Sequence, residues 1–136
     1  MARILSIDYG GKRTGIAVTD PFQIIATGLT TVNTHDLWPF LKKYFTDEVV
    51  EKVIIGMPVN WDESDTHATP LVAAFVKKFK KDYPALPIEE VDERYTSKMA
   101  KQSMLDSGMK KKDRRDKRNV DVIAATIILQ EYMPRQ

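Results

Sequence analysis

The pattern of apolar and polar positions predicts that the chain opens with three sequential strands. Arg3 to Asp8 and Thr14 to Thr19 are short runs of apolar and β-branched residues, and the glycine-containing segment 9–13 between them is typical of a hairpin turn. Ile24 to Val32 is a third run of the same kind. Together these runs predict an antiparallel meander.

Helical spacing begins after the third run. Apolar residues recur every three or four positions over Asp36 to Phe45, and Thr34 precedes this segment as a candidate N-cap. Lys52 to Met57 is a continuous apolar run, which is typical of a strand buried on both faces. Pro70 to Lys81 has apolar residues on one face and lysines on the other, so it predicts a second helix.

The remaining segments predict one strand and two helices. The strand is Ile88 to Val91, and the helices are Thr96 to Leu105 and Asn119 to Met133. The apolar stripe of the last helix consists of Val120, Ile123, Ala124, Ile127 and Ile128. This order predicts an α/β fold, in which two parallel strands complete a mixed five-stranded sheet with helices on both faces.

Composition limits the number of domains, the chemistry and the location that fit this architecture. A chain of 136 residues that is 43% hydrophobic and 29% charged is expected to form one globular domain, residues 1–136. It has no cysteine, which excludes disulfides, thiolate zinc sites and cysteine nucleophiles. No run reaches the roughly 20 apolar residues of a membrane helix, and Asp8 interrupts the first apolar run too early for a signal peptide. We therefore expect a cytoplasmic protein without a membrane partner.

The charge of the chain is uneven although the net charge is only +2. Residues 110–118 contain seven basic and two acidic residues. Such a block is commonly a solvated loop and otherwise contacts anions or nucleic acid, so by itself it does not decide the function. We predict a loop here.

Acidic residues follow two of the predicted strands, at the sheet edge where α/β proteins collect ligands. Asp8 ends the first strand and precedes Gly10, although an aspartate before glycine also serves turns. Asp92 and Glu93 directly follow the Ile88 to Val91 strand, although both could merely favour the positive end of the next helix.

Asp121 is the third acidic candidate. It lies near the start of the last helix beside the apolar stripe, and burial of an acid is costly unless a cation compensates it. The alternative is again a helix-dipole role. Three carboxylates at one sheet edge can hold Mg²⁺ or Mn²⁺, and two such ions can activate water for phosphodiester cleavage. Lys12 and Arg13, beside Asp8, are suited to phosphate oxygens or else form an ordinary hairpin tip.

Four segments in order resemble one known family: ILSIDYGGKRTGIAVTD, VIIGMPVN, VDERYTS and VDVIAATIILQEY. The chain resembles the YqgF family of pre-16S ribosomal RNA nucleases, which are also described as Holliday junction resolvases, over nearly its whole length. The resemblance implies a ribonuclease H-like fold, a cytoplasmic location and a role in maturing the 5′ end of pre-16S rRNA.

The resemblance also implies site residues. The catalytic acids and ligands of Mg²⁺ or Mn²⁺ would be Asp8, Glu93 and Asp121. Candidates for contact with the nucleic acid are Lys12, Arg13, Asn60 and Arg94, together with Lys111, Arg114, Arg115 and Arg118 of the basic segment. After Asn60 the sequence WDESDTHATP departs from the glycine-containing loop of the family, so no role is predicted for residues 61–69.

Three classes of function stay open at this point. The leading hypothesis is a metal-dependent endonuclease acting on pre-rRNA within ribosomal precursor particles, with branched DNA as the alternative substrate. A sugar-kinase or actin-like fold would need a second lobe, for which 136 residues leave no room. The third class is a non-catalytic nucleic-acid-binding module for ribosome assembly. The pattern distinguishes neither a monomer from a homodimer nor Asp92 from Glu93 as the second ligand.

Overall fold

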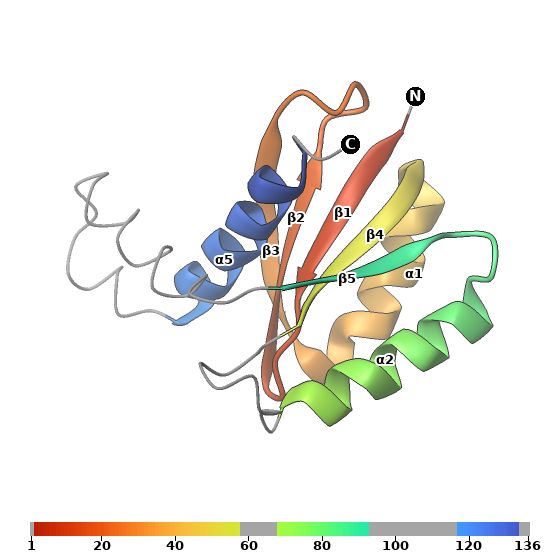
Figure 1. Ribbon diagram of the computed structural model, residues 1–136, viewed down its shortest axis with the longest axis vertical. Helices are drawn as coiled ribbons and strands as arrows, with labels where there is room; N and C mark the ends of the chain where they lie inside the picture. The colour runs from red at the N-terminus through yellow and green to blue at the C-terminus, as the bar shows by residue number, and fades with distance from the viewer. Residues whose placement is uncertain (1, 58–67, 93–116, 134–136) are drawn as a thin grey trace.

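The computed structural model describes residues 2–57, 68–92 and 117–133 (Figure 1). In chain order its elements are β1 (Arg3–Asp8), β2 (Arg13–Thr19), β3 (Ala26–Asn33), the 3-10 turn η1 (Thr34–Asp36), α1 (Leu37–Asp47), β4 (Val50–Met57), α2 (Ala68–Asp82), β5 (Ile88–Asp92) and α5 (Lys117–Tyr132). Their order and types confirm the prediction, while the helix predicted over Thr96 to Leu105 lies outside the described residues. No helix in the described ranges is long and apolar enough to cross a membrane.

The strands form one mixed sheet in the order β3-β2-β1-β4-β5. β1 pairs antiparallel with β2, and β2 pairs antiparallel with β3, whereas β1 with β4 and β4 with β5 are parallel pairs. This confirms the predicted meander and the two added parallel strands. The carboxyl ends of β1, β4 and β5 therefore meet at one edge of the sheet, which we call the carboxyl edge.

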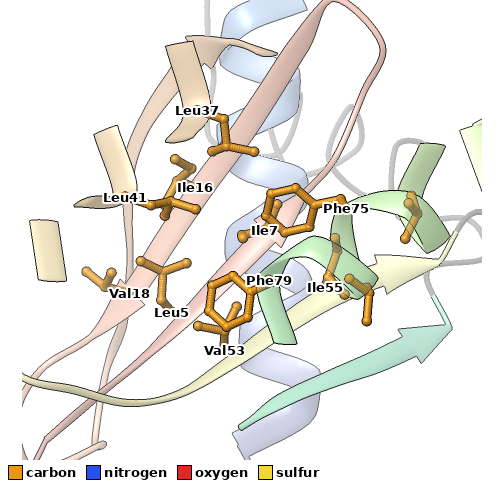
Figure 2. Close-up of a cluster of buried hydrophobic side chains, with 12 residues drawn as sticks. Leu5, Ile7, Ile16, Val18, Leu37, Leu41, Val53, Ile55, Phe75 and Phe79 are labelled. Carbon is orange, nitrogen blue, oxygen red and sulfur yellow. The ribbon is translucent and has the colours of Figure 1, made fainter. Parts of the chain in front are cut away.

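Helices α1 and α2 cover one face of the sheet. Alternation along β1 sends Leu5 and Ile7 to this face, where both are fully buried. Phe75 and Phe79 of α2 pack over them, as Figure 2 shows. Each such buried side chain contributes roughly 1.5–3 kcal/mol, so this larger cluster is the main core.

Helix α5 covers the opposite face. Its cluster contains Ile4, Ala17, Ile54, Ala125, Ile128, Leu129 and Tyr132. The Ser6 hydroxyl donates a 2.9 Å hydrogen bond to the Ala125 carbonyl oxygen. A Cβ on Gly15 would lie only 2.0 Å from the Asp121 carbonyl oxygen, so the backbone of α5 rests directly on β2.

Two local predictions about the first third of the chain are wrong. Ile24 and Ile25 precede β3 instead of belonging to it, because the Asp20 carboxylate accepts both of their N–H groups at 2.7 Å. Thr34 is not the N-cap of α1, which begins after Asp36. The Thr34 hydroxyl instead donates to the Gly10 carbonyl oxygen.

The predicted stripe of α5 is only partly correct. Ala124 and Ile128 are buried as expected, but the buried face continues through Ala125, Leu129 and Tyr132. Ile123 and Ile127 instead line an open groove of about 620 Å³ between β3 and α5. The helix also begins two residues earlier than predicted, so positions 117 and 118 of the predicted basic loop are helical.

Candidate active site

Asp8 lies at the carboxyl edge as the last residue of β1. It has the parity of Ile4 and Ser6, which face α5, so its half-buried side chain lies on the α5 face of the sheet. Across the β1–β2 ladder it is paired with Gly15. The structure therefore places Asp8 where the sheet edge meets the last helix.

Asp121 lies on the same face. It is the fifth residue of α5, beyond the first turn, so a role as a simple helix-dipole complement does not account for it. Its side chain is 22% exposed, and its carbonyl oxygen is the atom that approaches Gly15. The backbones of Asp8 and Asp121 are thus both neighbours of Gly15, and both residues lie on the same face of the sheet.

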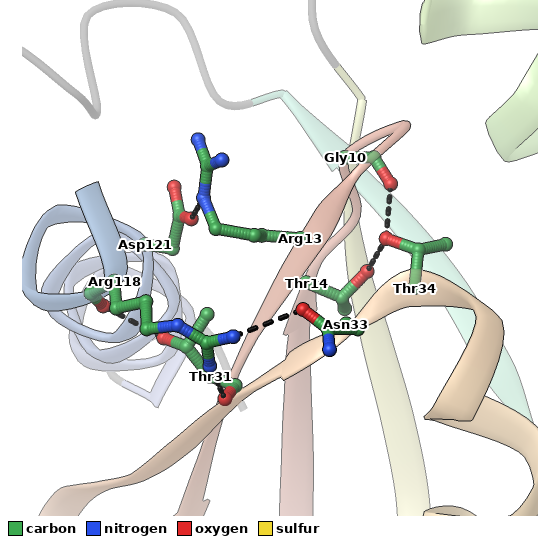
Figure 3. Close-up of polar contacts among 8 residues, drawn as sticks. All are labelled: Gly10, Arg13, Thr14, Thr31, Asn33, Thr34, Arg118 and Asp121. Atoms are coloured by element: carbon green, nitrogen blue, oxygen red, sulfur yellow. Dashed lines mark hydrogen bonds and ion pairs between the residues drawn. The ribbon is translucent and has the colours of Figure 1, made fainter.

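Arg13 supplies the positive charge beside Asp121. Its Nε donates to Asp121 Oδ2 at 3.0 Å, as Figure 3 shows. The two side chains are 29% and 22% exposed, so solvent screens the pair and it contributes at most about 1 kcal/mol to stability. The structure shows Arg13 paired with a candidate metal ligand, and the phosphate contact predicted for Arg13 stays a prediction. The second predicted cation, Lys12, is exposed at the same turn.

The turn after Asp8 is braced by residues that the sequence did not reveal. The Thr34 hydroxyl donates to the Gly10 carbonyl oxygen at 2.6 Å and lies 3.0 Å from the Thr14 hydroxyl (Figure 3). The Thr34 N–H also bonds the Lys12 carbonyl oxygen at 2.9 Å. Gly10 is required here, since a Cβ would lie 2.4 Å from the Arg13 carbonyl oxygen. These contacts hold the backbone between Asp8 and Arg13 in place.

Arg118 clamps the beginning of α5 to β3. Its guanidinium donates to the Thr31 carbonyl oxygen at 3.0 Å and to Asn33 Oδ1 at 2.9 Å, while the Thr31 hydroxyl donates to the Arg118 carbonyl oxygen at 2.7 Å (Figure 3). Because Asp121 lies one turn further along α5, the clamp helps to position this acid. The substrate contact predicted for Arg118 stays a prediction.

The end of β5, where the sequence places the candidate acids Asp92 and Glu93, is described only in part. β5 ends at the carboxyl edge, where Asp92 pairs with Met57 of β4. The other predicted site residues lie outside the described residues: Asn60, Glu93, Arg94, Lys111, Arg114 and Arg115. Within the described ranges no three acidic or histidine side chains form a cluster that could hold a metal ion.

Tyr9 follows Asp8 and was not among the predicted residues. Its ring packs against Phe75 at a centroid distance of 5.1 Å. Burial raises the pKa of the Tyr9 hydroxyl, so this group stays protonated at neutral pH and does not supply a general base. Tyr9 therefore anchors the turn to the main core.

Comparison with known proteins gives a family match along nearly the whole chain. The RuvX family model, described as Holliday junction resolvase, matches residues 2–135. A relative from Flavobacterium psychrophilum is 55% identical over 136 residues, which cover 100% of this chain and 99% of the relative. A relative from Christiangramia forsetii is 55% identical over 133 residues, covering 98% of each chain. Both carry the name "Putative pre-16S rRNA nuclease".

A solved structure supports the fold. T. thermophilus RuvC, in complex with a Holliday junction substrate, matches with a TM-score of 0.53 and 16% identity over 98% of this chain and 97% of that one. At this identity the likeness concerns the fold alone. It confirms the ribonuclease H-like architecture expected from the sequence.

Proposed function

Because this chain belongs to the RuvX family, the YqgF-type family that its sequence resembles, we propose that it is a metal-dependent endonuclease that processes the 5′ end of pre-16S rRNA. The family and its curated relatives are nucleases, and this chain is accordingly a hydrolase. The observation that carries the proposal is the meeting of Asp8 and Asp121 beside Gly15 at the carboxyl edge.

Mg²⁺ or Mn²⁺ would be held by Asp8 and Asp121, with Glu93 as the third ligand. These ions prefer oxygen ligands, and the two described donors are half-buried carboxylates on one face of the sheet. Two acids gathered at such an edge repel each other unless positive charge compensates them, and Arg13 supplies one such charge to Asp121. When bound, the metal would supply an activated water and stabilise the leaving oxygen of a phosphodiester.

Strand parity favours Glu93 over Asp92 as the third ligand. On β5, Glu89 accepts a 2.8 Å hydrogen bond from the Tyr132 hydroxyl of α5, and Val91 packs against the α5 cluster. Position 93 has the same parity as these two residues, whereas position 92 has the opposite parity. Glu93 lies outside the described residues, so this assignment rests on sequence parity.

Pre-rRNA is the favoured substrate because relatives 55% identical over the full chain are named for it. Lys12 and the basic segment 110–118 would contact the phosphate backbone, and binding should therefore weaken steeply as salt rises. The second candidate substrate is the four-way DNA junction, which the description of the family supports. Both substrates require the same hydrolysis at the carboxyl edge.

The test compares the purified chain on a 5′-extended 16S precursor RNA and on a four-way DNA junction, each with Mg²⁺ or Mn²⁺ and with a chelator. Asp8→Asn and Asp121→Asn should abolish cleavage and weaken Mn²⁺ binding measured by calorimetry. Asp82→Asn is the matched control, because Asp82 is an exposed acid at the end of α2. Cleavage that survives in both site variants, or that needs no metal, would contradict the proposal.

A further inference from the structure

Four large apolar side chains are exposed at the end of the molecule opposite the carboxyl edge. Phe22, Ile24 and Ile25 lie in the β2–β3 loop, and Val49 lies between α1 and β4. Their exposed fractions are 63%, 71%, 63% and 72%. We call these residues the apolar end patch. Single exposed apolar residues are common, but a gathered group of this size usually marks an interaction site.

Hydrogen bonds place the β2–β3 loop beside the amino end of β1 and Val49. Gln23 of the loop donates from Nε2 to the Ala2 carbonyl oxygen at 2.9 Å and also bonds the Glu51 carboxylate. The N–H of Arg3 donates to the Val49 carbonyl oxygen at 3.0 Å. Figure 1 shows the β2–β3 loop, the N-terminus and the beginning of β4 together at the top of the view, away from the carboxyl edge.

The loop holds its apolar side chains outward through a built turn. Asp20 Oδ1 accepts the N–H groups of Ile24 and Ile25 at 2.7 Å, and Oδ2 accepts that of Phe22 at 3.2 Å. Gln23 takes a positive φ of 60°. A polar network of this kind keeps the three side chains from folding back onto the sheet, so the patch is preformed for a partner.

The charge around the patch decides what kind of partner fits. Asp20, Asp47 and Glu51 carry carboxylates beside it, and Arg3 is already paired with Glu48. The two lysines of α1, Lys42 and Lys43, lie about one helical turn before Asp47 at the end of the helix. A second copy of this chain would oppose like charges across the interface, and a phosphate backbone would be repelled. A protein surface with an apolar centre and a lysine or arginine rim is complementary.

We propose that the apolar end patch docks this protein onto a basic protein of the small-subunit precursor particle. The choice of particle rests on the proposed function, whereas the chemistry of the partner rests on the patch itself. Docking through this end leaves the carboxyl edge turned away from the contact and open to RNA. The patch thus adds recognition of the particle to recognition of the RNA.

The test measures co-sedimentation of the chain with purified small-subunit precursor particles that carry 5′-extended 16S RNA. The double variant Phe22→Ser/Ile24→Ser should bind about tenfold more weakly, because a few buried anchor residues carry most of the affinity of an interface. Leu29→Ser is the matched control, since Leu29 is an apolar side chain 39% exposed outside the patch. Thermal denaturation checks that both variants are folded.

A photo-crosslinking amino acid at position 24 identifies the occupant. Adducts to a basic protein of the particle are expected, whereas adducts to RNA or to a second copy of the chain would overturn the proposal. Wild-type chain that does not bind the particle, or a double variant that binds like wild type, would overturn it as well. Naked precursor RNA separates the two proposals, because the double variant should cleave it at the wild-type rate. If the wild-type chain cleaves no RNA but its binding to the particle still depends on the patch, the proposed function fails and the docking surface stands.

Discussion

Replacing Gly15 by alanine tests whether the contact between β2 and α5 positions Asp121 beside Asp8. The added Cβ would lie 2.0 Å from the Asp121 carbonyl oxygen and 2.4 Å from its carbonyl carbon. Carbon and oxygen atoms in contact normally stay about 3.3 Å apart, so α5 must move by more than about 1 Å. The Cβ is fixed by the backbone of β2 and the atoms it meets are backbone atoms of α5, so no side-chain rotation relieves the clash.

The expected magnitude follows from this displacement. Overpacking of this kind typically costs about 1–3 kcal/mol, and the absence of a flexible atom places Gly15→Ala at the upper end. The melting temperature should therefore fall by several degrees. Because a shift of about 1 Å in a catalytic group can lower the rate on the order of 100-fold, metal affinity and cleavage should fall further than stability alone explains.

Gly28→Ala is the matched control in the same interface. A Cβ there would lie 3.1 Å from Thr126 Oγ1 and 3.1 Å from Val122 Cγ2, which are side-chain atoms. This variant should lose less stability and retain its affinity for Mn²⁺. Thermal denaturation and Mn²⁺ calorimetry on both variants give the comparison. If Gly15→Ala keeps wild-type stability and Mn²⁺ affinity, the close contact of α5 with β2 does not position Asp121. If both variants lose metal affinity equally, Gly15 has no special role.

Three further predictions concern charged side chains. Arg13→Gln should lower the free energy of unfolding by less than about 1 kcal/mol, because solvent screens the ion pair with Asp121, and it should weaken RNA binding. A larger loss of stability in urea denaturation would contradict this prediction. Hydrogen bonds with Tyr132, and to a smaller extent with Glu89, raise the pKa of Lys52. The contribution of Lys52 to stability is therefore fully present below the ordinary pKa of 10.5 and is lost as pH rises through the raised pKa. In urea denaturation, Lys52→Met should remove this loss of stability at alkaline pH. The N–H of Ile25, with those of Ile24 and Phe22, lowers the pKa of Asp20, so the turn is stabilised above the ordinary pKa of 3.8 and loosens as pH falls through the lowered pKa. Asp20→Ala should speed amide hydrogen exchange at Ile24 and Ile25 at neutral pH. Unchanged exchange in this variant would contradict the role of Asp20 in holding the turn.

The order and types of the described elements were predictable because their periodicity is strong. Lys52 to Met57, for example, is apolar after its first residue and forms all of β4 except the first two residues. The ends of elements were less predictable. Ile24 and Ile25 have the composition of a strand, but the Asp20 carboxylate captures their N–H groups before they can join a ladder. A local side-chain contact thus outweighed β propensity.

The orientation of α5 could not be derived from its sequence. Apolar residues occur nearly all round this helix, so several faces qualify as the buried one. Small residues decided the choice, because Gly15 and Gly28 of the sheet allow the helix backbone to approach closely. That approach depends on tertiary structure and leaves no periodic signal in the sequence of α5.

The candidate acids could be proposed from local patterns, whereas the residues that support them could not. Asp8 was selected because it ends a strand and Asp121 because it lies beside an apolar stripe, and their catalytic role stays a prediction. The ion pair of Arg13 with Asp121 joins residues 108 positions apart, and the bond from Thr34 to Gly10 joins residues 24 apart. Single-sequence patterns do not encode such pairs.

The seating of α5 on the first strands has a consequence for how the protein is made. Ser6 and Ala125, which share a hydrogen bond, are 119 positions apart, so the sheet that carries Asp8 is synthesised long before the helix that carries Asp121. A nascent chain would hold one half of the acid pair and lack the other. Under the proposed function, Asp8 and Asp121 can therefore act together only after α5 has been translated and has packed onto the sheet.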